Sequence, residues 1–143
     1  MIVESVLILD DHPATLHGIA DVLRSEDYSV LEAATGLQAI EIGGQCWRLS
    51  LLVSDIELPD LSGTEVALAL CGLYPHLPIL FMSGNAIADW SSQDRTNLQR
   101  FIPDLVGFLE KPFSASDLKM QVRNLIGRRA QIEIVERQGN QAA

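Results

Sequence analysis

VLILDDHP, at residues 6–13, places four apolar residues directly before two aspartates, a histidine and a proline. A short continuous apolar run of this kind is typical of a strand that is buried on both faces. Pro13 suits the first position of a helix. The apolar residues that follow it with helical spacing are Leu16, Ile19, Ala20 and Leu23. The stretch therefore predicts a buried strand, a charged turn and an amphipathic helix, in that order.

The same alternation of strand and helix continues along the chain. Strands are predicted at residues 6–9, 29–33, 51–54, 79–83 and 106–109. Helices are predicted from residue 13, after residue 36, from about residue 63 to 73, within 85–104, and after the S-x-x-D capping box at 114–117. Such alternation indicates an α/β fold with a parallel sheet. We expect a doubly wound, five-stranded parallel sheet of order 2-1-3-4-5, flanked by about five helices.

Length and charge narrow the possible functions. The 143 residues fit one domain, which we expect to span residues 1–129 and to be followed by a polar tail, frayed or disordered, at 130–143. A net charge of −9 argues against a direct nucleic-acid partner, because such binding requires clustered Lys and Arg. Cys46 and Cys71 have no CxxC spacing, which argues against a zinc site. No apolar run of membrane-spanning length and no signal peptide is present, so we expect a cytoplasmic protein with no membrane partner.

Charged and polar residues follow the predicted strands at one end. Asp10 and Asp11 follow the first strand, Asp55 the third, Ser83 ends the fourth and Lys111 comes after the fifth. In the order 2-1-3-4-5 the first and third strands are neighbours, so these side chains meet at the carboxyl edge of the sheet. Carboxylates about 4 Å apart repel by about 4 kcal/mol at an effective dielectric near 20, and a hard cation such as Mg²⁺ relieves that repulsion. We therefore expect Mg²⁺ (or Mn²⁺) beside an aspartate that can accept a phosphoryl group.

Four stretches together resemble one known family. They are VLILDDHP at 6–13, LVSDIELPDLSGTE at 52–65, ILFMSG at 79–84 and FLEKPF at 108–113. In this order and spacing the chain resembles a two-component response-regulator receiver domain, with the CheY-like (flavodoxin-like) fold. Two features depart from the family pattern: the stretch between Ser83 and Lys111 is several residues longer than is common, and no recognisable output module follows the last helix.

The resemblance implies a role for each residue of the expected site. Asp55 would be the phospho-acceptor and Lys111 would pair with the phosphoryl group. Asp11 and Asp55 would bind Mg²⁺ directly, Asp10 mainly through water, and Glu57 through its backbone carbonyl. Ser83 and Phe108 would be the switch residues. Glu57 and Asn85 would tune the lifetime of the phosphoryl group. Lys111-Pro112 would be a pair of the kind often joined by a cis bond.

The resemblance also implies partners. A sensor histidine kinase or a phosphotransfer protein would donate the phosphoryl group, and a downstream protein would bind the face formed by the fourth helix, the fifth strand and the fifth helix. Phosphorylation-dependent homodimers are a further expectation. Such a domain is not an enzyme beyond self-catalysed phosphoryl transfer and dephosphorylation. Two alternatives stay open. One is a phosphorylation-independent adaptor. The other is a haloacid-dehalogenase-like phosphatase, although that family's pattern D-x-D-x-T requires an aspartate two residues after Asp10, where this chain has His12.

Overall fold

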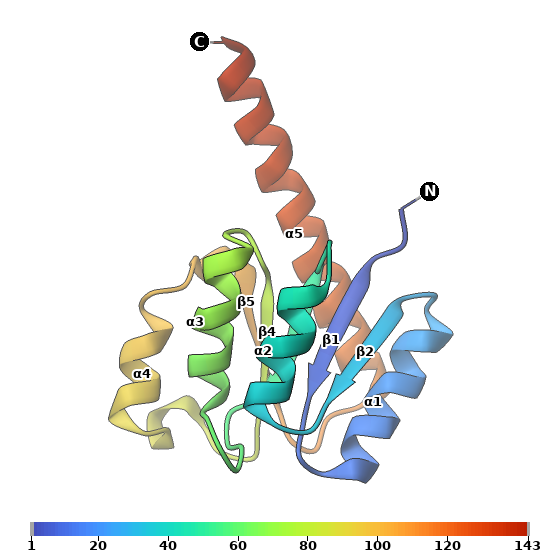
Figure 1. The fold of residues 1–143 in the computed structure, drawn as a ribbon, viewed down its shortest axis with the longest axis vertical. Helices are drawn as coiled ribbons and strands as arrows, with labels where there is room; N and C mark the ends of the chain where they lie inside the picture. The colour runs from blue at the N-terminus through green and yellow to red at the C-terminus, as the bar shows by residue number, and fades with distance from the viewer. Residues whose placement is uncertain (1, 143) are drawn as a thin grey trace.

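Five parallel strands form the centre of the computed structural model, which describes residues 2–142 (Figure 1). The strands are β1 (Ser5–Leu9), β2 (Ser29–Ala33), β3 (Leu51–Asp55), β4 (Ile79–Ser83) and β5 (Val106–Glu110). The helices are α1 (Pro13–Ser25), α2 (Gly36–Gln45), α3 (Gly63–Leu73), α4 (Ser92–Leu98) and α5 (Ala115–Ala142). The strand order is β2-β1-β3-β4-β5, so the predicted fold class and sheet order are confirmed.

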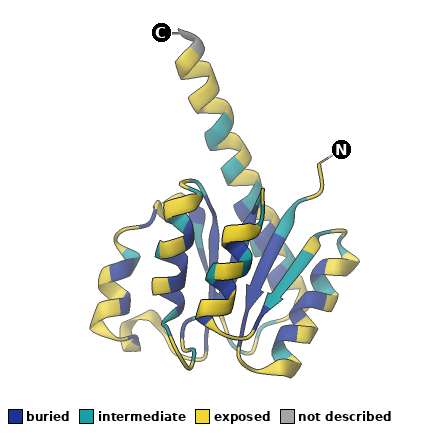
Figure 2. Cartoon of the chain, viewed as in Figure 1, coloured by how far each residue is buried: buried dark blue, intermediate teal, exposed yellow. Residues whose placement is uncertain are grey.

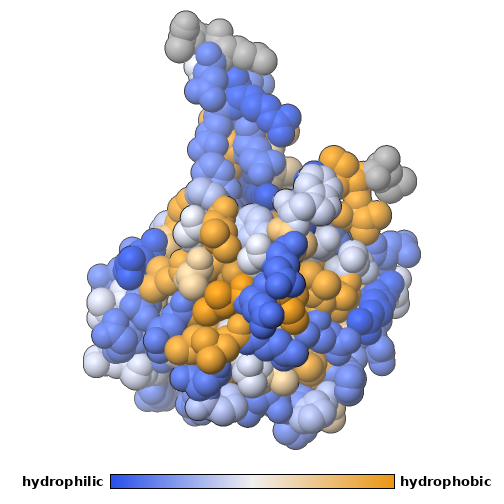
Figure 3. Space-filling view, viewed as in Figure 1, coloured by the Kyte–Doolittle hydropathy of each residue, from blue (hydrophilic) through white to orange (hydrophobic). Residues whose placement is uncertain are grey.

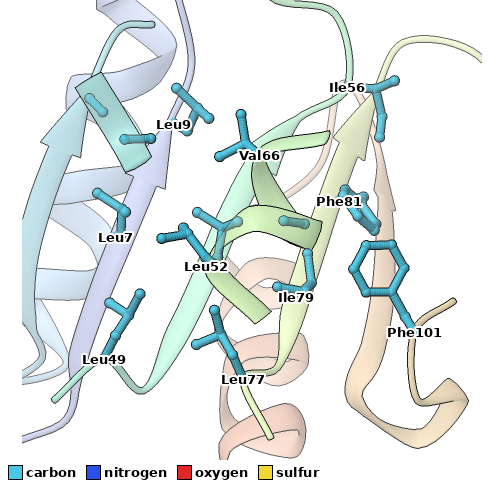
Figure 4. Packing of buried hydrophobic residues seen from close by; sticks show 14 of the residues in the cluster. Leu7, Leu9, Leu49, Leu52, Ile56, Val66, Leu77, Ile79, Phe81 and Phe101 are labelled. Atoms are coloured by element: carbon cyan, nitrogen blue, oxygen red, sulfur yellow. The ribbon is translucent and has the colours of Figure 1, made fainter. Parts of the chain in front are cut away.

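Each face of the sheet carries its own apolar cluster, because successive residues of a strand point to opposite faces. The cluster toward α2 and α3 includes Leu7, Leu9, Leu52, Ile79 and Phe81 (Figure 4). The cluster toward α1 and α5 includes Val6, Ile8, Val53, Leu80 and Met82. Figure 2 shows the central strands as buried along their length, whereas β2 at the edge is mostly half-buried. The site at the strand ends therefore stands on a rigid base with both faces covered.

The segment between β4 and β5, for which the sequence predicts a loop and one helix, contains α4 and two short 3₁₀ helices, Ile87–Asp89 and Pro103–Leu105. The helix α4 begins at Ser92, and the Ser91 side chain caps it by accepting a hydrogen bond from the backbone N–H of Asp94 at 3.0 Å. Pro103 follows α4 and opens the second 3₁₀ helix. The added length of this segment is thus folded into ordered elements.

The helix α5 differs from the sequence expectation. The sequence predicts a frayed or disordered tail at 130–143, but the helix continues to Ala142 and projects past the amino-terminal edge of the sheet (Figure 1). Arg129 anchors it by donating to the Leu49 carbonyl at 2.8 Å and to Glu133, one turn later, at 3.1 Å. Glu136 lies 3.2 Å from His76 in the loop before β4. No proline follows Pro112 in the sequence, so nothing of that kind interrupts the helix.

The projecting part of α5 is mostly hydrophilic on the face that Figure 3 shows. Ile134 and Val135 are exposed there, but they are flanked by charged and amide side chains. Within residues 2–142, no helix has both the length and the apolar character that crossing a membrane would require.

Candidate functional site

Three carboxylates meet at the carboxyl edge of the sheet, as the sequence predicts. The register of β1 and β3 sets Leu9 beside Ser54, so Asp10 and Asp55, the next residues of each segment, are neighbours. Oxygen atoms of Asp10, Asp11 and Asp55 all lie within 4.8 Å of one another. Asp10 is fully buried, Asp55 is half-buried and Asp11 is exposed. The three carboxylates therefore form a graded site that opens from the interior toward solvent.

Lys111 completes this group from the opposite side. Its ammonium nitrogen Nζ lies 2.9 Å from Asp10 Oδ2 and 3.0 Å from Asp55 Oδ2. Its backbone N–H donates to the Ser83 carbonyl at 2.8 Å, so the end of β4 fixes the start of the loop after β5. The Lys111-Pro112 bond is cis, as the family resemblance led us to expect. One cation thus bridges the two carboxylates that lie deepest in the site.

The surroundings shift the acid–base properties of this pair. Burial raises the pKa of Asp55, and the hydrogen bond and charge of Lys111 oppose that rise without cancelling it, while the Asp10 charge adds to it. At Lys111, burial alone would lower the pKa, but hydrogen bonds to Asp10 and Asp55 outweigh it and raise the pKa of the ammonium group. Lys111 is therefore a cation at neutral pH, and its single charge does not fully compensate the burial of the Asp55 carboxylate.

An open pocket of about 450 Å³ lies above these charges. Its lining consists of Asp11, Asp55, Glu57, Leu58, Pro59, Ser83, Gly84, Asn85 and Lys111. The Ser83 hydroxyl accepts a hydrogen bond from the Asn85 backbone N–H at 3.0 Å. The Asn85 side-chain amide lies 3.5 Å from Glu57 Oε1, so these two residues approach each other at the mouth of the pocket. The pocket therefore has a carboxylate floor and a polar rim.

Two of the predicted site residues lie outside the lining of this pocket: Asp10, which is fully buried, and Phe108. Phe108 is paired with Phe81 across β4 and β5, and the two rings stack with centroids 6.1 Å apart. About 38% of Phe108 is exposed. The Phe108 ring therefore belongs to the surface beside the pocket, on the same face of the sheet as the side chains of Phe81 and Ser83.

Several contacts around the site have no signal in the sequence pattern. The backbone N–H of His12 donates to the buried Asp10 Oδ1 at 2.8 Å and holds that carboxylate in place. The Asp60 carboxylate accepts hydrogen bonds from the backbone N–H groups of Gly36 and Leu37, both at 2.9 Å, at the start of α2. Trp90 packs against Phe108. The contacts of Asp60 and Trp90 join separate elements, so local spacing does not reveal them, whereas the contact between His12 and Asp10 lies within one turn of the chain.

The donor atoms suit a divalent cation. Three carboxylates in close range and an open side toward water offer only oxygen ligands, which is the set that Mg²⁺ prefers. A cation bound beside Asp55 would oppose the rise in its pKa that burial causes, because it favours the charged form. The residues present therefore fit Mg²⁺.

Comparisons with known proteins agree with this geometry. The family model described as "response regulator receiver domain" matches residues 6–123. The sensor kinase CckA of Brucella abortus is 32% identical over 126 residues, which cover 85% of this chain and 12% of that protein. The cell cycle transcriptional regulator CtrA of Caulobacter vibrioides is 27% identical over 123 residues, which cover 86% of this chain and 50% of that protein. The chain thus spans half or less of these curated relatives.

Solved structures show the same fold. A CheY-like response regulator receiver domain protein from Methanospirillum hungatei superimposes with a TM-score of 0.79 at 24% identity, covering 91% of this chain and 98% of that one. The receiver domain of the hybrid histidine kinase CckA superimposes with a TM-score of 0.67 at 28% identity, covering 85% of this chain and 98% of that one.

Proposed function

The chain belongs to the response regulator receiver domain family, and from this premise we propose that Asp55 accepts a phosphoryl group from a histidine kinase or a phosphotransfer protein. The contact between Lys111 Nζ and Asp55 Oδ2, at 3.0 Å within the three-carboxylate site, carries the proposal. Asp55 faces the pocket, whereas Asp10 is fully buried and already hydrogen-bonded to Lys111 and to His12. Asp55 is therefore the carboxylate that combines access with a cation beside it.

The transfer requires one bond exchange. A carboxylate oxygen of Asp55 attacks the phosphorus of a phosphohistidine, the new P–O bond forms as the P–N bond breaks, and the imidazole of the donor takes up a proton. The Lys111 ammonium group stabilises negative charge on the transferring oxygens. Water later cleaves the acyl phosphate and regenerates the carboxylate. Glu57 and Asn85, which approach each other at the rim, would control the entry of that water.

Asp11 and Asp55 would hold Mg²⁺ directly, Asp10 mainly through water, and the Glu57 backbone carbonyl would add a ligand; Mn²⁺ suits the same oxygen donors. When bound, the ion neutralises charge on the phosphoryl group and on the carboxylates. The chain's own groups have separate tasks: Lys111 orients the Asp55 carboxylate, and the His12 N–H fixes Asp10.

The phosphoryl group adds charge beside Ser83, and we propose that the Ser83 hydroxyl turns toward it and that Phe108 changes its packing. The readout would be binding of a downstream protein, or of a second copy of the chain, through the face formed by α4, β5 and α5. Phe108 is exposed on β5 within that face.

The test is incubation with acetyl phosphate and Mg²⁺ followed by intact-protein mass spectrometry. The wild-type chain should gain one phosphoryl mass, and removal of Mg²⁺ with EDTA should prevent the gain. Asp55→Asn should gain none, whereas the control Asp104→Asn, which removes the same charge at an exposed position, should behave as the wild type. Labelling that persists in Asp55→Asn would reject Asp55 as the acceptor.

Two further measurements separate the alternatives. Steady release of phosphate from a phosphate ester would support a phosphatase instead of a receiver. A partner that binds with equal affinity with and without the phosphoryl donor would support an adaptor that does not use phosphorylation.

A further inference from the structure

Trp90 links the pocket to the exposed aromatic surface by two kinds of contact. Its indole Nε1–H donates to the backbone carbonyl of Asn85 at 3.2 Å. Its ring centroid lies 5.9 Å from that of Phe108 and 6.0 Å from that of Phe81. The side chain is 93% buried, since only 7% of Trp90 is exposed. One residue just before α4 therefore holds both the loop after β4 and the ring on β5.

Asn85 extends this connection into the pocket. Its backbone N–H donates to the Ser83 hydroxyl at 3.0 Å, and its side-chain amide reaches toward Glu57 at the rim. The backbone carbonyl of the same residue accepts the Trp90 indole N–H. Asn85 is thus held at both backbone polar groups, by Ser83 on one side and by Trp90 on the other.

The sheet places all of these groups on one face. Phe81 and Ser83 are two residues apart on β4, so their side chains point to the same face, and Phe108 is the register partner of Phe81 on β5. Figure 4 shows Phe81 on this face, with the ring of Phe101 next to it; the ring centroids lie 5.8 Å apart. Trp90 covers this row from the side of α4. A movement of the loop at Asn85 therefore changes the surroundings of Phe108 through a single side chain.

We propose that Trp90 is a positioning residue that couples occupation of the phosphorylation pocket to the packing of Phe108. The inference rests on the proposed function of Asp55. When the Ser83 hydroxyl turns toward a phosphoryl group, it ceases to accept the Asn85 N–H, so the loop is released at that end. The Asn85 carbonyl then carries the indole of Trp90 with it, so the packing between the rings of Trp90 and Phe108 changes.

The alternative is that Trp90 only fills the apolar core. A phenyl ring at this position would largely preserve that packing but would lack the N–H that holds the Asn85 carbonyl. Trp90→Phe therefore removes the proposed coupling and retains most of the aromatic contact, which makes it the informative variant.

The chain offers a direct probe, because it has only two tryptophans. Trp47 is 89% exposed in the loop after α2, so Trp47→Phe leaves Trp90 as the sole indole fluorophore at small structural cost. In that variant we expect acetyl phosphate with Mg²⁺ to change the acrylamide quenching of Trp90 by about twofold or more, in proportion to the phosphoryl mass measured in the same samples. Adding Asp55→Asn should abolish the change.

This design distinguishes the two possible failures. If Asp55 gains the phosphoryl mass and the emission and quenching of Trp90 stay unchanged, the coupling role of Trp90 is overturned while the proposed function stands. If no phosphoryl mass appears, the proposed function is overturned and this inference with it. The experiment keeps Trp90 intact, so it does not depend on the folding of a Trp90 variant.

A second measurement follows Phe108 itself. Fluorine NMR of protein labelled with 4-fluorophenylalanine reports on the four phenylalanines, and Phe108→Leu assigns the signal of Phe108. At equal phosphoryl occupancy, the shift of the Phe108 signal should be smaller by about twofold or more in Trp90→Phe than in the wild type. The control Trp47→Phe should leave that shift unchanged. An equal shift in Trp90→Phe would overturn the proposal.

Discussion

The α-carbon of Gly63 faces the backbone carbonyl of Asp55 so closely that a β-carbon on Gly63 would lie 2.0 Å from that oxygen. The Gly63 N–H also donates to the Ile56 carbonyl at 2.8 Å. The first residue of α3 is therefore seated directly against the strand end that carries Asp55, the proposed phospho-acceptor.

Gly63→Ala should destabilise the fold, because the added methyl group meets backbone that cannot move without displacing Asp55. We expect the free energy of unfolding in urea to fall by about 1–3 kcal/mol. Gly72→Ala, in the same helix, is the matched control: a β-carbon there meets nothing within 4 Å. It should raise the free energy of unfolding by about 0.5–1 kcal/mol. Equal effects of the two substitutions would contradict this account of Gly63.

Lys111→Ala should lower the free energy of unfolding, because it leaves the buried Asp10 carboxylate without its cation. Measured in urea without added divalent cation, the loss should be about 1–3 kcal/mol, below the usual cost for a deeply buried pair because the Lys111 side chain is 26% exposed. Lys119→Ala removes a more exposed ion pair with Glu26 at 3.4 Å and should cost less than about 1 kcal/mol. Similar losses for both lysines would argue against a special role of Lys111 in neutralising the site.

Asp60 should give the fold a pH-dependent contribution at the acid end. The backbone N–H groups of Leu37 and Gly36 lower the pKa of Asp60 below its ordinary value of 3.8. The folded pKa is depressed, so the contribution is fully present above the unfolded pKa and is lost as the pH falls through the folded one. The difference in unfolding free energy between wild type and Asp60→Asn should therefore be largest near neutral pH and shrink as the pH falls from about 5 to below 3.8.

Urea unfolding at a series of pH values measures that difference. Asp21→Asn, which removes the same charge at an exposed position in α1, serves as the control. A difference in unfolding free energy between wild type and Asp60→Asn that stays constant over the acid range would refute the capping role of the Asp60 carboxylate.

Asp94→Ala should loosen α4. The buried Asp94 carboxylate accepts hydrogen bonds from Ser62, from Thr64 at 2.6 Å and from Ser91 at 2.9 Å, which tie α4 to the start of α3. We expect the free energy of unfolding to fall by about 1–3 kcal/mol relative to the wild type. Amide hydrogen exchange should accelerate more in α4 than in α1. Asp89→Ala, at an exposed position of the preceding 3₁₀ helix, should change neither. Undiminished protection of α4 in Asp94→Ala would exclude this anchor.

Removal of residues 130–143 should leave the receiver fold intact. Residues 130–140 of α5 are exposed or half-buried, and Arg129, which holds the Leu49 carbonyl, remains in the shortened chain. We expect the unfolding free energy to fall by less than about 1 kcal/mol, which corresponds to the loss of exposed ion pairs such as His76 with Glu136. Cooperative unfolding at a similar urea midpoint would support the proposed domain of residues 1–129. A large loss would assign the projecting helix to the fold.

Much of the site could be predicted from local sequence because parallel strands align their ends. Asp10, Asp55 and Lys111 each follow an apolar run, and the sheet order brings these ends to one edge. No comparable rule predicts which side chains of separate elements come into contact. Asp60 meets Gly36, 24 residues earlier, and Asp94 meets Thr64, 30 residues earlier, and no periodicity relates the members of either pair.

The end of α5 is a second feature that the local sequence pattern did not predict. A polar sequence after residue 129 has little apolar surface to bury, which suggested a tail. In the structure the helix continues to Ala142, Arg129 is hydrogen-bonded to the Leu49 carbonyl, and the ion pair of Arg129 with Glu133 supports the next turn. The contact with Leu49, 80 residues earlier, is not encoded in the local pattern.

By itself, the sequence determined the order of strands and helices, the α/β class and the charged residues at the strand ends, because hydrophobic periodicity and right-handed crossovers restrict a chain of this length to few arrangements. Only the tertiary structure decided which side chains meet between elements: Asp60 with the start of α2, Asp94 with α3, and Trp90 with Phe108. The reason is geometric, since such pairs depend on how separate elements pack, and packing selects them by shape and hydrogen-bonding partners that the local pattern does not encode.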